Sequence, residues 1–273
     1  METVSLTNLA IATYVIAFAY RSLTLGTDPE TGLPRSSTWP CFPLAVVAIG
    51  LHGLGLMQAN GFGSNINFSV LHAMSLVMLA TNVLVLLTSL LKPVEQLGII
   101  TFPLTAFILI LGQVFPEPVR MVHQTSSGMT AHILASIIAF SFLSIAAIQA
   151  ILLSIQDACL RRRHFKAWIL RSMPSLESME SLMFRLIGAG LLLLTVSLAT
   201  GFLFLENMFA QHLAHKTVLS LLAWIIFGTL ILGRVRFGWR GVIAIRWTLF
   251  GFLSLLLAYF GSKIAIELIL KRG

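Results

Sequence analysis

Seven histidines are the residues of this sequence best suited to chemistry, because an imidazole can bind a metal, hold a haem iron or carry a proton. Two of them, His212 and His215, stand three residues apart in "HLAH", directly before an apolar run. Side chains three residues apart share one face of a helix, so this pair could act together. Lys216 follows them and adds a positive charge at the same point.

The elements that must position these histidines are membrane helices. The chain is 57% hydrophobic and only 10% charged, whereas soluble domains carry roughly 25% charged residues. Apolar runs of about 20 residues, long enough to cross a bilayer, occupy approximately 5–24, 40–58, 68–91, 97–115, 129–157, 183–205, 216–233 and 243–266. Lipid cannot satisfy free backbone groups, so each run should be helical. We expect an all-α, polytopic membrane protein with eight transmembrane helices and one integral membrane domain over 1–273.

The basic residues predict how this bundle is oriented. The net charge of +8 would suggest nucleic acid in a soluble protein, but here it fits the excess of Lys and Arg on cytoplasmic loops. If the N-terminus is outside, thirteen of the 18 Lys and Arg residues fall inside and the other five outside. We therefore expect both termini outside, with the basic segment "CLRRRHFKAWILR" inside. The expected partner of these charges is the lipid bilayer, and no nucleic acid is expected.

This topology places six of the seven histidines in the outer half of the bundle, and only His164 inside. At 1.5 Å per residue, His72 lies roughly 6 Å into the third span from outside. His52 lies roughly 18 Å from the inner end of the second span, past its midpoint. The remaining outer histidines, at or near span ends, are His123, His132, His212 and His215. Histidines held within a membrane tend to mark a site, so their common side favours one.

Three chemistries compete for these histidines. Zinc would need three or four ligands, and Glu206 and Glu117 could contribute, but the sequence has no HExxH or HxxEH spacing. A proton relay would need carboxylates in mid-span, where the sequence has essentially none. Haem needs one or two axial ligands and an apolar wall, and cations for its propionates. Histidines from different spans, 19 Phe, 5 Trp and the outer Lys216 and Arg120 meet those needs.

His132 and His215 are the predicted principal ligands. Both stand near a helix N-terminus, where the positive end of the helix dipole favours the neutral ring that a metal requires. Because they lie at similar depth, one haem could be held between them, with Lys216 and Arg120 near its propionates. His52 and His72 could form another site or could simply hydrogen-bond between helices, and the second reading is favoured.

Several other polar and small residues are predicted to be structural. Asn82 and Gln149 should hydrogen-bond between helices, and the glycines of "GLHGLG" and "GAG" should allow close helix approach. Cys41 and Cys159 form no CxxC pair and fall at inner span boundaries. We expect both thiols to be reduced, since the cytosol keeps thiols reduced.

Four segments in order, "TAHILASIIAFSFLSIAAIQAILL", "MESLMFRLIGAGLLLLTVSLATGFLF", "AHKTVLSLLAWIIFGTLILGRVRFGWRG" and "IRWTLFGFLSLLLAYFGSK", resemble the cytochrome c assembly superfamily. That superfamily contains the CcsA and CcmC haem-handling proteins, and the HemX/YpjD-like inner-membrane branch is the most similar. The resemblance covers roughly residues 40–270. It implies that His132 occupies the position of an external haem ligand, and that His215 and Lys216 stand at the end of the family's haem loop.

The sequence also departs from the family pattern. The tryptophan-rich motif of the haem loop is absent, because residues 205–215 contain no Trp. The second external histidine of the family has no counterpart in "YFGSKIAIELILKRG". His215 could replace the missing ligand.

The resemblance implies a haem-binding, haem-handling protein of a bacterial inner (plasma) membrane, linked to cytochrome c assembly and not itself an enzyme. Its partners would be other cytochrome c assembly or membrane proteins. The alternative is a regulatory or accessory subunit of another membrane protein, with a degenerate haem site. A third hypothesis, a small-solute or metal transporter, ranks last because the spans lack broken helices and a charged path.

Overall fold

The computed structural model describes residues 2–24, 41–60, 66–67, 69–91, 96–115, 121–122, 127–161, 174–204 and 214–261. Two compact units are distinguished: unit 1 comprises Met1–Gln124 and Gln156–Ser175, and unit 2 comprises Thr125–Ile155 and Leu176–Gly273. Within the described residues, eight helices are long and apolar enough to cross a membrane. The prediction of an all-α protein with eight spans is therefore confirmed, whereas the side on which the termini lie stays a prediction.

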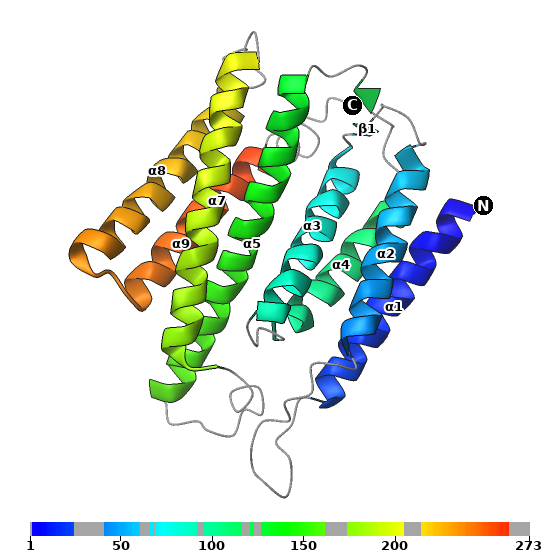
Figure 1. The fold of residues 1–273 in the computed structure, drawn as a ribbon, viewed down its shortest axis with the longest axis horizontal. Helices are drawn as coiled ribbons and strands as arrows, with labels where there is room; N and C mark the ends of the chain where they lie inside the picture. Colours follow the sequence, from blue (N-terminus) through cyan, green and yellow to red (C-terminus); the bar gives the residue numbers. More distant parts are fainter. Residues whose placement is uncertain are drawn as a thin grey trace, which may run out of the picture. The chain divides into compact units, whose positions relative to one another are not determined.

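Unit 1 is built from four helices, labelled in Figure 1. They are α1 (Glu2–Thr24), α2 (Cys41–Asn60), α3 (Val70–Leu91) and α4 (Gln96–Val114). Two-residue strands, β1 (Ile66–Asn67) and β2 (Met121–Val122), pair antiparallel with Ile66 opposite Val122. This pairing ties the segment before α3 to the segment after α4.

The core of unit 1 consists mostly of alanines, which let α1, α2 and α4 approach closely. Its buried members are Ala10, Tyr14, Ala17, Ala45, Ala48, Phe102, Ala106 and Leu109. Tyr14 and Phe102 are its two aromatic members, and their ring centroids lie 5.7 Å apart. Small residues at helix contacts are typical of membrane bundles, where close packing drives association.

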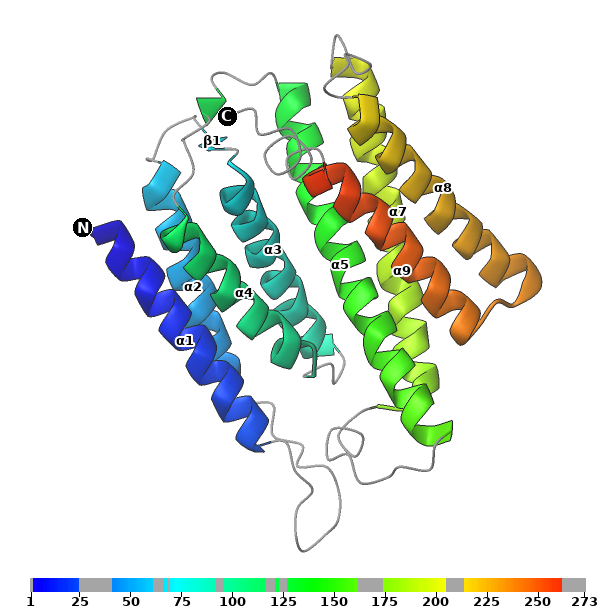
Figure 2. The same ribbon diagram turned by 180° about the vertical axis from the view of Figure 1, so that it is seen from behind.

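Unit 2 contains the four remaining helices, best separated in Figure 2. They are α5 (Ser127–Arg161), whose last six residues belong to unit 1, α7 (Leu176–Phe204), α8 (Ala214–Phe237) and α9 (Val242–Leu256), the last continued by the π-helical turn η1 (Leu257–Gly261). Gly190 of α7 faces the buried Leu143 of α5, and a Cβ on this glycine would lie 2.7 Å from that side chain. Glycine is therefore required for this approach, whereas Gly188 has open space around it.

Two of the predicted polar contacts between helices are present. Asn82 of α3 donates from Nδ2 to Thr105 Oγ1 of α4 at 2.7 Å, and Thr105 donates its own proton to the carbonyl of Thr101. Gln149 of α5 donates from Nε2 to the backbone carbonyl of Met179 of α7 at 3.4 Å. Both predictions of interhelical hydrogen bonding are confirmed.

The start of α7 differs from the sequence expectation, which placed it at residue 183. The helix begins at Leu176, and its first turns carry Glu177 and Glu180, which lower the local hydropathy. Glu180 accepts hydrogen bonds from Arg234 at 2.7 Å and from the backbone N–H of Gly241 at 3.2 Å. The carboxylate therefore clamps the turn between α8 and α9 onto the first turns of α7.

Aromatic side chains also pack around the turn between α8 and α9. Trp239 packs flat against Gly233, where any side chain would collide with the indole, and its ring lies 5.3 Å from that of Trp247. Gly238 and Gly241 have φ values of 67° and 55°, which non-glycine residues seldom adopt. These features explain the segment "GWRG", whose glycines make the turn and whose tryptophan fills it.

Candidate functional site

His132 lies in the second turn of α5, and its ring is anchored to α7. Its Nδ1–H donates to the backbone carbonyl of Ser197 at 2.8 Å. A carbonyl can only accept, so in the neutral ring the proton is on Nδ1 and Nε2 carries the lone pair. Metal-ligating histidines usually have this arrangement, with the second ring nitrogen donating to a carbonyl or carboxylate.

Two serines brace the contact around His132. Ser136, one turn along α5, donates to the carbonyl of His132 at 2.7 Å, and its Oγ lies 2.7 Å from Ser197 Oγ. Because Ser136 uses its only proton on that carbonyl, Ser197 is the donor in the second bond. Ser197 is 4% exposed. The ring of His132 is thus held by a rigid junction of α5 and α7.

His215 is the second residue of α8. Its Nε2 is buried and has no hydrogen-bond partner among the described residues. Buried polar atoms are nearly always paired, so an orphaned ring nitrogen is a candidate ligand atom. Lys216 follows with a half-buried side chain, while Arg120, the other predicted propionate partner, lies outside the described residues.

The two predicted ligands lie at the same end of unit 2. Helices α5 and α8 both begin where α7 ends, as Figures 1 and 2 show. No hydrogen bond joins the two rings within the described part of the chain. His132 and His215 are the residues of this end that would hold a haem, through the imidazole nitrogens that they do not use in hydrogen bonds.

Both ring nitrogens of His52 hydrogen-bond to neighbouring helices of unit 1. It is 2% exposed, its Nε2 lies 2.8 Å from Ser75 Oγ of α3, and its Nδ1 lies 3.3 Å from the Tyr14 hydroxyl of α1. Both ring nitrogens are therefore occupied. The interhelical hydrogen bonding favoured for this residue from the sequence is present, and no ring nitrogen is left for a metal in this arrangement.

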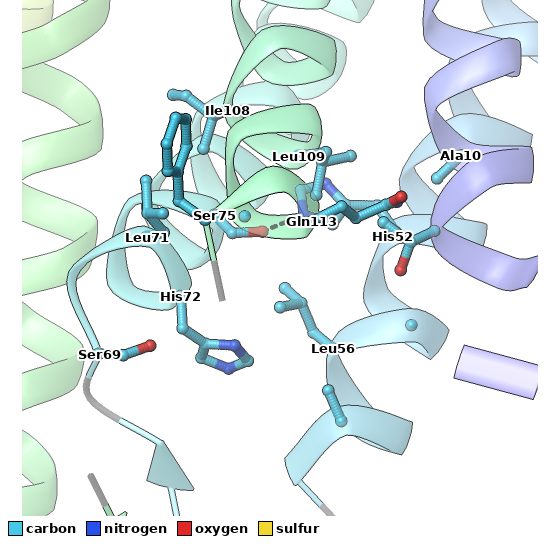
Figure 3. Close-up of a pocket in the computed structure, with 15 residues that line it drawn as sticks. Ala10, His52, Leu56, Ser69, Leu71, His72, Ser75, Ile108, Leu109 and Gln113 are labelled. Carbon is cyan, nitrogen blue, oxygen red and sulfur yellow. Dashed lines mark hydrogen bonds between the residues drawn. The ribbon is translucent and has the colours of Figure 1, made fainter. Parts of the chain in front are cut away.

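His72 is different, because it lines a pocket of about 270 Å³ in unit 1 (Figure 3). Its ring points into the space between α3 and Leu56 of α2. Its Nε2 is buried and has no hydrogen-bond partner among the described residues. His52 and Ser75 lie on the wall of the same pocket, so the two histidines of unit 1 share a cavity in different roles.

Most of the residues that bear on a zinc site lie outside the described ranges, and so does the side chain of one of the two cysteines. Within the described ranges, no three His, Cys, Asp or Glu side chains are grouped as a metal site. The other histidines, 123, 164 and 212, and the carboxylates 117 and 206 lie outside those ranges. Cys159 is a free thiol, and Cys41 opens α2 with a side chain that is not described.

Comparison with known proteins identifies the family. The model of the cytochrome C assembly protein family matches residues 38–270, in agreement with the region expected from the sequence. Inner membrane protein YpjD of Escherichia coli is 33% identical over 233 residues, covering 82% of this chain and 86% of that protein. Protein HemX of Brevibacillus brevis is 24% identical over 159 residues, covering 56% of this chain and 58% of that protein.

A shorter similarity extends to the cytochrome c biogenesis protein CcsA of Gloeobacter violaceus. It is 30% identical over 87 residues, which is 31% of this chain and 26% of that protein. No solved structure gives a significant match. The chain, a helical membrane protein, therefore belongs to the cytochrome c assembly family, in its HemX/YpjD-like branch.

Proposed function

We propose that this protein binds and handles haem for cytochrome c assembly, at the end of unit 2 where α5 and α8 begin. It would hold haem without acting as an enzyme, in a bacterial inner membrane, alongside other cytochrome c assembly proteins. Family membership supports the link to cytochrome c assembly. Its similarity to an inner membrane protein and to a cytochrome c biogenesis protein supports the location and the pathway.

One observation carries the assignment of His132 as ligand, namely its bond to Ser197. The carbonyl of α7 fixes the proton on Nδ1, and the lone pair on Nε2 is then the only atom of the ring that can bind iron. The same bond sets the orientation of the ring. The bond therefore presents Nε2 in a fixed direction, as a metal ligand requires.

His215 is the proposed second ligand, because its buried Nε2 has no partner within the described ranges. Bound haem would supply an iron that accepts imidazole nitrogens and two propionates that attract cations. Lys216 is the proposed propionate partner in unit 2, whereas Arg120, predicted from the sequence for the same role, lies outside the described residues. An ion pair at a protein surface contributes about 1 kcal/mol or less, so a propionate partner should matter less than a ligand.

The test is the Soret absorbance of protein purified from haem-replete cells. We expect the parent to carry haem, His132→Ala and His215→Ala each to shift or weaken the band, and the double variant to lose it. His72→Ala is the control, since it removes a histidine of unit 1 and should leave the spectrum unchanged. The proposal is wrong if the parent is haem-free. An unchanged spectrum in the double variant would exclude His132 and His215 as ligands and direct attention to His72, whose Nε2 has no partner among the described residues.

An accessory or regulatory subunit is the second candidate. Its specific support is the absence of Trp from residues 205–215, where the family resemblance implies a tryptophan-rich haem loop. This candidate predicts a haem-free parent protein that nevertheless co-purifies with another membrane protein after mild detergent extraction. The haem proposal predicts the pigment whether or not a partner is recovered.

A further inference from the structure

The pocket of unit 1 has features that the proposed haem site does not explain. The described residues that line it come from all four helices of this unit. Its apolar wall includes Leu56, Leu71 and Leu109, and its polar wall includes Thr7, His72 and Gln113. None of the described lining residues is Asp, Glu, Lys or Arg. An occupant should therefore be neutral, with both an apolar body and hydrogen-bonding atoms.

Some polar groups in the pocket wall already have hydrogen-bond partners, whereas one ring nitrogen has none among the described residues. His52 and Ser75 bond to each other at 2.8 Å and form a fixed part of the wall. Three residues before Ser75, on the same face of α3, His72 has a buried Nε2 without a partner among the described residues. A ligand atom that pairs with this nitrogen would satisfy a group that is otherwise costly to bury.

The size and position of the pocket restrict the ligand further. A volume of about 270 Å³ lies just below the roughly 300–1,000 Å³ of sites for drug-sized ligands. It suits a one- or two-ring headgroup and is too small to enclose a whole haem. Phe115 lines the pocket and is 61% exposed, so the pocket opens where α4 ends. A ligand with an apolar tail could leave its headgroup inside and its tail in lipid.

We propose that this pocket binds the headgroup of a membrane quinone or quinol, with His72 Nε2 hydrogen-bonded to a ring oxygen. A quinone headgroup is a neutral ring with polar oxygens on opposite edges, and it carries an apolar tail. These properties match the uncharged lining, the orphaned imidazole nitrogen and the opening beside Phe115. The proposal concerns binding alone and is independent of the haem site in unit 2.

The experiment uses the full chain in lipid nanodiscs and a matched pair of probes, 2-methyl-1,4-naphthoquinone and 2-methylnaphthalene. The two probes share one carbon skeleton and differ in the ring oxygens. We expect saturable binding of one quinone per chain above empty nanodiscs, and at least tenfold weaker binding of the hydrocarbon. His72→Ala should weaken quinone binding about tenfold, the effect of one buried hydrogen bond, and should leave hydrocarbon binding unchanged.

Two glycine variants give a steric test that does not depend on histidine. Gly112 of α4 lines the pocket, and an added Cβ there meets no atom within 4 Å, so Gly112→Leu should fill the pocket without disturbing the packing. Gly50 of α2 also has open space around it and is outside the pocket lining. Gly112→Leu should abolish quinone binding, and Gly50→Leu should preserve it.

The proposal is overturned if the parent binds no quinone saturably, or if both probes bind equally and His72→Ala changes neither. It is also overturned if His72→Ala removes a haem spectrum, because the pocket would then belong to haem. Thermal unfolding of each variant shows whether it folds. If His72→Ala does not fold, His72→Gln and Gly112→Leu still decide the outcome.

Discussion

The buried polar side chains include two groups: those that hydrogen-bond to a neighbouring helix, although Asn82 Oδ1 and Gln149 Oε1 have no partner among the described residues, and two histidines with an unpartnered ring nitrogen. His52, Asn82 and Gln149 each hydrogen-bond to a neighbouring helix. His72 and His215 each keep a buried Nε2 without a partner in the described part of the chain. The first group holds helices together, and the second group is available to a ligand.

The Asn82–Thr105 bond gives a prediction for the first group. Thr105 spends its proton on the carbonyl of Thr101, so Asn82 must be the donor. A double-mutant cycle with Asn82→Ala and Thr105→Ala should give a coupling energy of about 0.6 kcal/mol, the average measured between helices in membranes. Equilibrium unfolding in mixed micelles would measure it. A coupling energy of zero would show that the bond contributes nothing to stability.

At the residue scale, sequence spacing predicts part of the candidate site. His132 and His215 were identifiable because both precede or open apolar runs. Ser136 and Ser75 were not, although each follows a histidine at the helical spacing of three or four. The reason is that serine is common in membrane helices and its partner cannot be read from the chain. The anchor of His132 is a backbone carbonyl, which carries no sequence signal at all.

At the scale of helices, the packing of α5 against α7 leaves no free space for a side chain at Gly190. Gly190→Ala would place a Cβ 2.7 Å from the buried Leu143, and we expect a loss of about 1–3 kcal/mol, as for overpacked cores. Gly188→Ala is the matched control two residues earlier, since its Cβ meets nothing within 4 Å. It should be neutral or stabilising by up to about 1 kcal/mol, because alanine is the better helix former.

Thermal unfolding of both variants in the same detergent would measure the difference. Equal midpoints for Gly190→Ala and Gly188→Ala would mean that the two helices do not approach as described.

The clamp at the start of α7 gives a second prediction for helix packing. Glu180→Gln removes the charge that Arg234 pairs with at 2.7 Å, and the carboxylate is only partly exposed. We expect destabilisation of about 1–3 kcal/mol, because Arg234 loses its charged partner in a largely desolvated place. Glu177→Gln, on an exposed position of the same helix, should change stability by about 0.5 kcal/mol or less.

Chemical or thermal unfolding would measure both glutamate variants. If Glu177→Gln and Glu180→Gln changed the free energy of unfolding equally, the contacts of Glu180 with Arg234 and Gly241 would not stabilise the protein.

Hydropathy predicted the existence of each helix better than its ends. The apolar middle of α7 was evident, but its first seven residues were missed because glutamates there suggest a loop. Glu180 is compatible with the helix only because Arg234 and Gly241 come from far along the chain. The hydropathy of neighbouring residues therefore cannot predict that Glu180 lies in a helix, because its partners lie 54 and 61 residues later.

For the whole molecule, the distribution of basic residues predicts how the helices are oriented in the membrane. The excess of Lys and Arg on one set of loops predicts that both termini lie outside and that the 158–182 segment lies inside. Reporters active on only one side, inserted at residues 162–173 and fused after residue 273, should signal from opposite sides. A signal from the outer side at 162–173 would reverse the topology and move both candidate ligands to the cytoplasmic side.

Glu180 also constrains the order in which the protein can be completed during synthesis. Its partners Arg234 and Gly241 lie 54 and 61 residues later, so α7 leaves the ribosome with a carboxylate that nothing yet neutralises. Only when α8, the glycine turn and the start of α9 have followed can these two partners reach the carboxylate. A nascent chain that stalls earlier lacks the contact that fixes the α8–α9 turn against α7.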